Sequence, residues 1–254
     1  MRLNKFLAHC GIASRRQCDE IIFEKRVTVN ETIIDAPGTE IDPDKDLITV
    51  DGDRVRLIKQ FTYIKLQKPQ GYISTKKDPH ADQTVMDLLP KPYQHLVPIG
   101  RLDKDTTGIL LFTDDGDLVH TLIHPRYEVE KQYLVQLAVA PAGFPEEELP
   151  KGVTLEEKAI ANGQAIPLNG KRTLYRVILK EGKKREVKRI FRHYNTKVRK
   201  LHRELFAGIS ADDLAPGDWK KLTSDEIKKL KEQSVGKEFT QKRRQGRQKK
   251  LKQN

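Results

Sequence analysis

A charged segment between two apolar stretches carries the residues best suited to chemistry. It spans residues 98–116, and Asp103 stands in it between Arg101 and Lys104. A neighbouring cation favours the ionised form of a carboxyl group, and an ionised carboxylate on a loop can act as a nucleophile or a base. An ordinary surface turn can also contain an Asp, so Asp103 alone does not establish a reaction.

Other acidic residues and histidines form no metal-binding pattern. The carboxylates after Asp103 lack the spacing of a calcium loop. Thr113-Asp114-Asp115 is typical of a helix start, where negative charge meets the positive end of the helix dipole. His120, His124 and His202 show no ligand spacing, and the sequence has no P-loop or GxGxxG motif. We therefore expect no metal and no cofactor.

Five motifs in order along the chain resemble those of the pseudouridine synthases. Gly100-Arg101-Leu102-Asp103 resembles the signature whose aspartate is the catalytic residue in that family. The other four are Lys68-Pro69-Gln70-Gly71-Tyr72, His124-Pro125-Arg126 with Glu130-Lys131-Gln132-Tyr133-Leu134-Val135, residues 181–189, and Leu201-His202-Arg203-Glu204. The resemblance covers roughly residues 1–231. It is strongest to the branch of ribosomal small subunit pseudouridine synthase A.

The resemblance implies a role for each candidate site residue. Asp103 is catalytic, Lys188 pairs with its carboxylate, and Tyr133 lies against the target base. Arg101 fills the space left by the flipped base, and Leu201 forms an apolar wall beneath it. Without the motifs, these residues are equally a turn aspartate, a solvated lysine, a core tyrosine, a phosphate contact and a core leucine.

Isomerising uridine to pseudouridine breaks an N–C glycosidic bond and rejoins the base through carbon. No redox or energy cofactor is needed. The base must first leave its stack, which costs a few kcal/mol in a duplex. Asp103 either attacks the anomeric carbon of the ribose or removes a neighbouring sugar proton, and the sequence leaves both open.

Some positions depart from the family pattern. Glu31 stands where glycine is common, Lys183 where arginine is common, and Arg185-Glu186 where His-Gln or Arg-Gln are common. We expect the departure at Glu31 to affect only its turn, and the departures at 183 and 185–186 to change local RNA contacts rather than catalysis. Lys183, Lys184 and Arg185 remain candidate RNA-binding residues.

The N-terminal region resembles the S4 RNA-binding domain. Leu3, Phe6, Leu7 and Cys10 recur at helical spacing, and Ser14 can cap a second helix. Arginine side chains and helix N-terminal N–H groups both suit phosphate oxygens. A solvated charged face is the simpler alternative. The candidate RNA-binding residues are Arg2, Lys5, Arg15, Arg16, Lys25 and Arg26.

The fold class expected is α+β in three regions. Residues 1–58 form the S4-like unit, with short strands at 27–29, 32–34 and 47–50. Residues 59–232 form the catalytic domain, whose strands and helices mix without βαβ alternation, so a largely antiparallel sheet is expected. Its expected strands are 61–66, 95–99, 109–113, 132–139, 173–179 and 197–205, and its expected helices are 83–89, 117–123, 187–194 and 224–231. Residues 233–254 form a disordered basic tail.

The charge balance favours a polyanionic partner. Lys and Arg outnumber Asp and Glu by 48 to 36, and residues from 237 onward carry +7 of the net +12. Cations placed near phosphates release condensed counterions. The two cysteines, Cys10 and Cys18, indicate buried thiols in a reducing compartment. With no membrane-length apolar run and no apolar leader, we expect a cytoplasmic protein with no membrane partner.

The function expected is pseudouridine formation in rRNA. By resemblance alone the substrate is 16S rRNA, at uridine 516 in bacterial numbering, free or in a small-subunit assembly intermediate, and the protein is a monomer. The alternatives are a 23S rRNA or tRNA enzyme, a non-catalytic RNA-binding or ribosome assembly protein, and a hydrolase with a pair of carboxylates.

Overall fold

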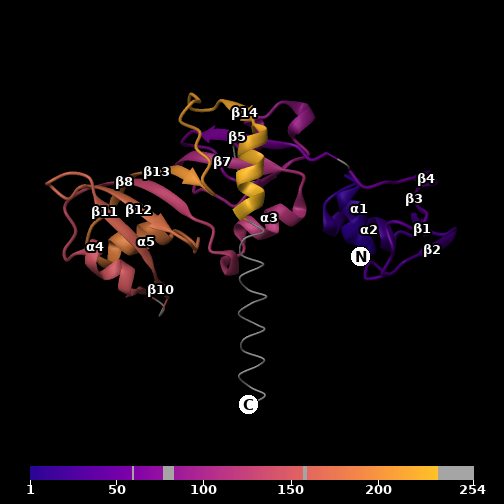
Figure 1. Ribbon diagram of the computed structural model, residues 1–254, viewed down its shortest axis with the longest axis horizontal. Coiled ribbons are helices and arrows are strands. Elements are labelled where there is room, and N and C mark those ends of the chain that lie inside the picture. The colour runs from indigo at the N-terminus through magenta and orange to yellow at the C-terminus, as the bar shows by residue number, and fades with distance from the viewer. Residues whose placement is uncertain (59, 77–82, 157–158, 234–254) are drawn as a thin grey trace, which may run out of the picture. The chain divides into compact units, whose positions relative to one another are not determined.

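The computed structural model describes residues 1–58, 60–76, 83–156 and 159–233 (Figure 1). It divides into two compact units. The first comprises Met1–Thr62 with Asp114–Gly116, and the second comprises Tyr63–Thr113 with the chain from Asp117 onward. Apart from its first residue, the expected basic tail at 233–254 lies outside the described residues.

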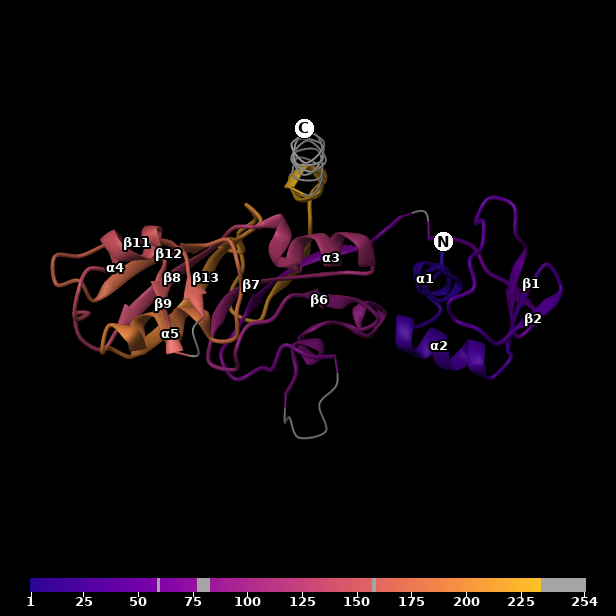
Figure 2. The ribbon, with the colours of Figure 1, turned by 90° about the horizontal axis from the view of Figure 1, so that it is seen from below.

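The first unit combines two helices with a small sheet (Figure 2). The helices are α1 (Leu3–His9) and α2 (Arg15–Phe23). The antiparallel strands run in the order β2 (Thr32–Ile34), β1 (Val27–Val29), β3 (Ile48–Val50) and β4 (Asp53–Arg54). This confirms the expected succession of helix, helix and strands.

Local sequence explains both helices of this unit. Leu3, Phe6 and Leu7 of α1 share one apolar core with Cys18 and Ile22 of α2 and with the first strands. Ser14 caps α2: its Oγ accepts a hydrogen bond from the Gln17 N–H, and the Gln17 side chain accepts one from the Ser14 N–H. A capping box of this kind satisfies two donors that a helix start leaves unpaired.

Both cysteines of the first unit are free thiols, with Cys18 buried and Cys10 half-buried. Burial, followed by the charge of the nearby Cys18, raises the pKa of the Cys10 thiol to about 12. The thiolate is the reactive form of cysteine. Neither position therefore suits nucleophilic chemistry.

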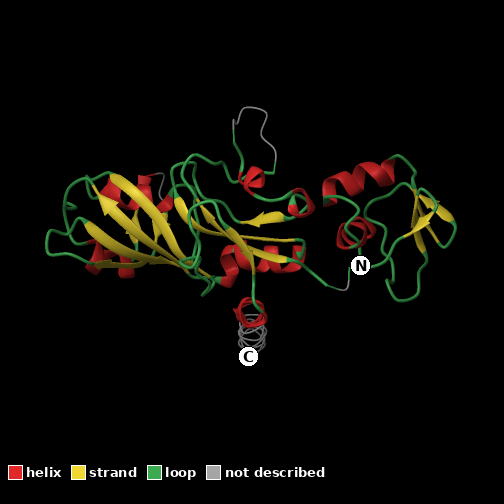
Figure 3. Ribbon diagram, turned by 90° about the horizontal axis from the view of Figure 1, so that it is seen from above, coloured by secondary structure: helices red, strands yellow, loops and turns green. Residues whose placement is uncertain are grey.

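The second unit is built on an eight-stranded sheet (Figure 3). The strand order is β11-β12-β8-β13-β7-β5-β14, and β6 also pairs with β7. Every pair is antiparallel except β7 with β13. The strands are β5 (Tyr63–Lys68), β6 (Val97–Ile99), β7 (Thr107–Thr113), β8 (Lys131–Leu137), β11 (Gly163–Pro167), β12 (Leu174–Leu179), β13 (Val198–Phe206) and β14 (Trp219–Lys221). The expected mixed, largely antiparallel sheet is confirmed.

Short helices and turns complete the second unit. Helix α5 packs against strands β8 and β12 through a core that includes Val135, Val177, Ile190 and Phe191. The helices are α3 (Gly116–Ile123), α4 (Pro145–Glu148) and α5 (Glu186–His193), and residues 224–233 are also helical. The 3₁₀ turns are η1 (Val85–Leu88), η2 (Lys91–Tyr93), η3 (Pro125–Tyr127) and η4 (Leu149–Lys151), and β9 (Val153–Thr154) pairs with β10 (Ile160–Ala161).

One expected helix is wrong. Residues 83–89 form only the 3₁₀ turn η1, because Thr84 and Asp87 close a capping box around a single turn and Leu89 is extended. In the described ranges, no helix is long and apolar enough to cross a membrane.

Candidate active site

The family motifs meet in one cleft of the second unit. The cleft has a volume of about 1350 Å³. Its lining comes from the loop between β6 and β7, from β8, from the turn that leads into α5, and from β13. The expected residues among the lining are Arg101, Asp103, Tyr133, Lys183, Lys184, Arg185, Lys188 and Leu201.

Gly108 allows the two central strands to meet beside this loop. It lies opposite Arg203 in the parallel pair of β7 and β13. A Cβ atom at Gly108 would lie 2.2 Å from the Arg203 carbonyl oxygen, and its φ of +110° favours glycine. The glycine therefore permits the close approach that joins the two halves of the sheet under the loop.

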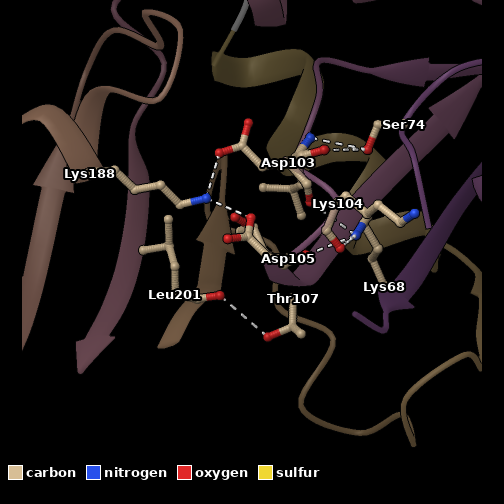
Figure 4. A network of polar contacts seen from close by, with 10 residues as sticks. Lys68, Ser74, Asp103, Lys104, Asp105, Thr107, Lys188 and Leu201 are labelled. Carbon is tan, nitrogen blue, oxygen red and sulfur yellow. Dashed lines mark hydrogen bonds and ion pairs between the residues drawn. The ribbon is translucent and has the colours of Figure 1, made fainter. Parts of the chain in front are cut away.

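Lys188 lies between two carboxylates of the loop (Figure 4). Its Nζ is 2.8 Å from Asp103 Oδ2 and 2.6 Å from Asp105 Oδ1. The Lys188 side chain is only 11% exposed, whereas that of Asp103 is 37% exposed and reaches the cleft. Burial alone would raise the pKa of Asp105, but the hydrogen bond and charge of Lys188 hold it below its usual value. Asp103 is thus held by an ammonium group while it stays open to a substrate.

Lys68 holds the backbone of the same loop. Its buried Nζ donates to the carbonyl oxygens of Thr106 at 2.9 Å, Pro69 at 3.1 Å and Asp103 at 3.2 Å. Burial lowers the pKa of Lys68 to about 8, although the charges of Asp105 and Asp103 act in the opposite direction. These carbonyl oxygens thereby replace the water molecules that the ammonium group loses on burial.

Ser74 holds the other side of the loop. Its hydroxyl donates to the Leu102 carbonyl oxygen at 3.0 Å and accepts from the Leu102 N–H at 3.1 Å. The backbone on both sides of Asp103 is therefore fixed by side chains. Ser74 belongs to none of the five sequence motifs, and the position of Lys68 at the start of one of them does not predict its role in holding the loop.

Tyr133 and Leu201 form the inner wall of the cleft. Tyr133 is 9% exposed and Leu201 is 8% exposed. Burial raises the pKa of Tyr133, while the charge and hydrogen bonding of Arg203 lower it. Arg101 also lines the cleft and is exposed.

The turn before α5 places three cations at the rim of the cleft. Lys183, Lys184 and Arg185 are exposed, and the Lys183 ammonium pairs with Glu181 at 2.7 Å. Glu186 is buried beneath them and accepts a hydrogen bond from the Lys183 N–H at 2.9 Å. Burial, followed by the neighbouring Glu181 carboxyl, raises the pKa of Glu186 to about 7. Of the departures from the family pattern in this turn, Glu186 therefore lies under the rim, whereas Lys183 and Arg185 lie on it.

The expected RNA-binding cations of the first unit differ in their partners. Arg2, Arg15, Arg16 and Lys25 are exposed, whereas Lys5 is half-buried. Arg26 is exposed too, but it donates to both carboxylate oxygens of Asp51, at 2.8 and 2.6 Å, and to Glu24 at 3.1 Å. Its guanidinium is thus already engaged in a two-point contact of the kind a phosphate would need.

The described residues contain no group of three or more His, Cys, Asp or Glu side chains arranged to hold a metal ion. The acids of the loop face Lys188 instead, so their charge is balanced by an ammonium group.

Known proteins resemble both units. The RNA pseudouridylate synthase model matches residues 62–193, and the S4 domain model matches residues 1–48. Ribosomal small subunit pseudouridine synthase A of Escherichia coli is 38% identical over 229 residues, 89% of this chain and 98% of that protein. Ribosomal large subunit pseudouridine synthase B of Bacillus subtilis is 36% identical over 234 residues, 91% of this chain and 95% of that protein.

A solved structure supports the same conclusion. A crystal structure of a pseudouridylate synthase matches with a TM-score of 0.66 and 31% identity, covering 91% of this chain and 99% of that chain. The expected resemblance and the expected kind of enzyme are confirmed. The chain belongs to the RNA pseudouridylate synthase family and carries an S4 domain at its N-terminal end.

Proposed function

We propose that this enzyme converts a uridine of rRNA to pseudouridine, with Asp103 as the catalytic carboxylate. The observation that carries the proposal is the ion pair between Lys188 and Asp103 in a cleft where the family motifs meet. The Lys188 ammonium group pairs with the carboxylate and fixes its direction. An ionised Asp103 can attack the anomeric carbon or remove a sugar proton.

The other wall residues then acquire roles. Tyr133 stacks against the flipped base, since an aromatic ring offers a flat apolar face and a polar tip. Leu201 supports the base from beneath, and Arg101 enters the vacated stack, where a planar guanidinium can replace a base and contact phosphate. None of these steps requires a group from outside the chain.

The two units divide binding from chemistry in this proposal. Residues 1–58 grip RNA through Arg2, Lys5, Arg15, Arg16 and Lys25, and residues 59–232 carry the reaction. Lys183, Lys184 and Arg185 add phosphate contacts at the rim of the cleft. The residues from 233 onward add non-specific affinity through their charge. We further propose that the enzyme acts as a monomer in the cytoplasm.

We propose 16S rRNA as the substrate. The motif residues Asp105-Thr106-Thr107-Gly108 and Leu201-His202-Arg203-Glu204 support this choice, as does the Escherichia coli relative, which is named for the small subunit. The Bacillus subtilis relative is named for the large subunit and supports 23S rRNA as the second candidate.

The reaction is tested by tritium release from C5-tritiated uridine in rRNA and in subunit assembly intermediates. The native enzyme should release tritium, and Asp103→Asn should release none above background. Asp212→Asn is the matched control, because Asp212 is an exposed Asp outside the cleft lining. Release by Asp103→Asn at the native rate would show that another group is the catalytic carboxylate.

The substrate is tested by mapping pseudouridines in a strain that lacks the gene. Loss of one 16S site, restored by the native gene and not by Asp103→Asn, is the expected result. Loss of a 23S site with every 16S site intact would select the second candidate.

A further inference from the structure

Arg203 is a buried arginine at the cleft to which the proposed reaction gives no role. It is 2% exposed, and its guanidinium carbon lies 4.7 Å from the centre of the Phe206 ring. Its Nε and Nη2 both donate to the Ile109 carbonyl oxygen, at 2.9 and 2.7 Å. A charged group is costly to bury unless its hydrogen-bonding capacity is used. The Ile109 carbonyl oxygen and the Phe206 ring therefore stabilise the buried guanidinium of Arg203 in one position.

The strand register brings Arg203 to Tyr133. The two residues lie directly opposite each other in the antiparallel pair of β8 and β13. Side chains of directly opposed residues lie on the same face of a sheet and interact. The guanidinium thus reaches from the Ile109 carbonyl on β7 to the Tyr133 side chain on β8.

The chemistry of the guanidinium sets the direction of the Tyr133 hydroxyl. Arginine has donors and no acceptor, so the phenol oxygen accepts from Arg203. The proton of the hydroxyl must then point away from Arg203. Burial raises the pKa of Tyr133, the charge and hydrogen bonding of Arg203 lower it, and the carboxylates of Glu186 and Asp103 raise it. Arg203 is thus the cation that counters burial at this hydroxyl.

We propose that Arg203 is the positioning residue for Tyr133, fixing its ring at the cleft wall and keeping its hydroxyl proton free for the cleft. This inference rests on the proposed function, in which Tyr133 lies against the target base. Arg203 is too buried to contact phosphate. It therefore acts through Tyr133 and through the packing of β7 against β13.

The test compares Arg203→Lys and Arg203→Met with Arg176→Met. Arg176 is a matched control, because it lies on β12 of the same sheet, pairs with Glu204 at 3.1 Å and does not line the cleft. The chain is labelled with 3-fluorotyrosine, which ionises at lower pH than tyrosine. The Tyr133 signal among the seven tyrosines is assigned by its loss in Tyr133→Phe. The titration of residue 133 is then measured in each variant, together with the RNA affinity and the single-turnover tritium release of that variant.

The expected result has three parts. The pKa of residue 133 rises in Arg203→Met, rises less in Arg203→Lys, and is unchanged in Arg176→Met. Single-turnover release falls by about 10²-fold in Arg203→Met, the scale of a small misplacement at a reacting centre, and is partly restored by lysine. RNA affinity stays at its native value.

Two results would overturn the inference. The first is an unchanged titration of residue 133 in a folded Arg203→Met or Arg203→Lys protein. The second is a loss of RNA affinity that accounts for the whole loss of rate. If Arg203→Met does not fold, Arg203→Lys decides, because lysine keeps the positive charge and lacks the planar guanidinium group. The titration needs no substrate, so it also decides if the native enzyme releases no tritium from rRNA.

Discussion

Cationic side chains in the two units of this enzyme differ in burial and in their partners, although basic residues cluster in the sequence of both units. In the second unit Lys68, Lys188 and Arg203 are buried or nearly so, and carbonyl or carboxylate oxygens surround them. In the first unit Arg15 and Arg16 are exposed at the start of a helix. Buried cations shape the catalytic loop, whereas exposed cations are available to a polyanion.

Charge alone therefore does not identify a phosphate contact. Lys188 and Lys184 stand four residues apart in one basic run. One is held between Asp103 and Asp105, and the other is exposed. Partners and burial separate their roles, so substitutions at matched positions should affect either rate or affinity.

The largest effect is expected from Lys188→Met. It removes the ammonium group that pairs with both Asp103 and Asp105, so Asp103 is no longer held in one direction. Single-turnover tritium release should fall by about 10²–10³-fold, as it does when a preorganised charged partner is removed. RNA affinity should stay close to native. Lys184→Met is the matched control and should lower affinity while it leaves the rate at saturating RNA unchanged. The reverse pattern would break the distinction between the two lysines.

Gly108→Ala should be the most destabilising change to the sheet. The new Cβ would lie 2.2 Å from the Arg203 carbonyl oxygen, at a φ that side chains rarely adopt. We expect the free energy of unfolding to fall by about 3–5 kcal/mol in denaturant titrations, since strain and a backbone clash act together. Gly170→Ala is the control, because a Cβ there meets nothing within 4 Å. Equal effects of the two substitutions would show that β7 and β13 can separate without cost.

Local patterns predicted much of this architecture. Helical spacing of apolar residues and the Ser14 cap predicted α1 and α2, and the order of the motifs predicted the cleft residues. Edge strands β11 and β14 were not predicted. β11 is a short strand in which the apolar residue Ile166 is exposed, and β14 has only three residues, two of them lysines. Such segments lack the alternation of buried and polar residues that marks a strand.

Long-range pairing is the part that the sequence could not supply. Gly108 and Arg203 lie opposite each other across a parallel pair, although they are far apart in the sequence. Nothing in the spacing of either residue predicts the other. The burial of Arg203 accompanies this pairing, and Lys68 lies beside Gly108 through the separate pairing of β5 with β7. Sequence reasoning therefore found Asp103 and its partner Lys188 through the motifs, and it missed how Ser74, Lys68 and Arg203 hold the neighbouring backbone and strands.

The buried Glu186 carboxyl group provides a pH test of the difference between buried and exposed charged groups. The pKa of Glu186 is raised to about 7, above its ordinary value of 4.5. The folded state therefore binds its proton more tightly than the unfolded state does. The associated stability is present below about pH 4.5 and is lost as the pH rises through about 7.

Glu186→Gln keeps an acceptor for the Lys183 N–H and removes the ionisation. At pH 8 this variant should therefore be more stable than the native chain, by about 1–3 kcal/mol, and near pH 4 the gain should vanish. Denaturant unfolding at both pH values measures it. Glu147→Gln, at an exposed position, should show no such gain. A gain for Glu186→Gln that is the same at both pH values would show that ionisation is not the cause.

The smallest effect concerns two arginines of the first unit. Arg16 is exposed, whereas Arg26 is held by Asp51 and Glu24. If exposed cations contact phosphate, Arg16→Ala should reduce the slope of log affinity against log salt by about 0.7–0.9, the value for one lost phosphate contact. The double variant Arg26→Gln/Asp51→Asn removes an ion pair without changing the net charge, so its slope should match the native slope. Filter binding or fluorescence anisotropy over a range of salt concentrations gives both slopes. An equal fall in the double variant would mean that Arg26 exchanges Asp51 for phosphate on the RNA, and that an ion pair in the free protein does not exclude a role in binding.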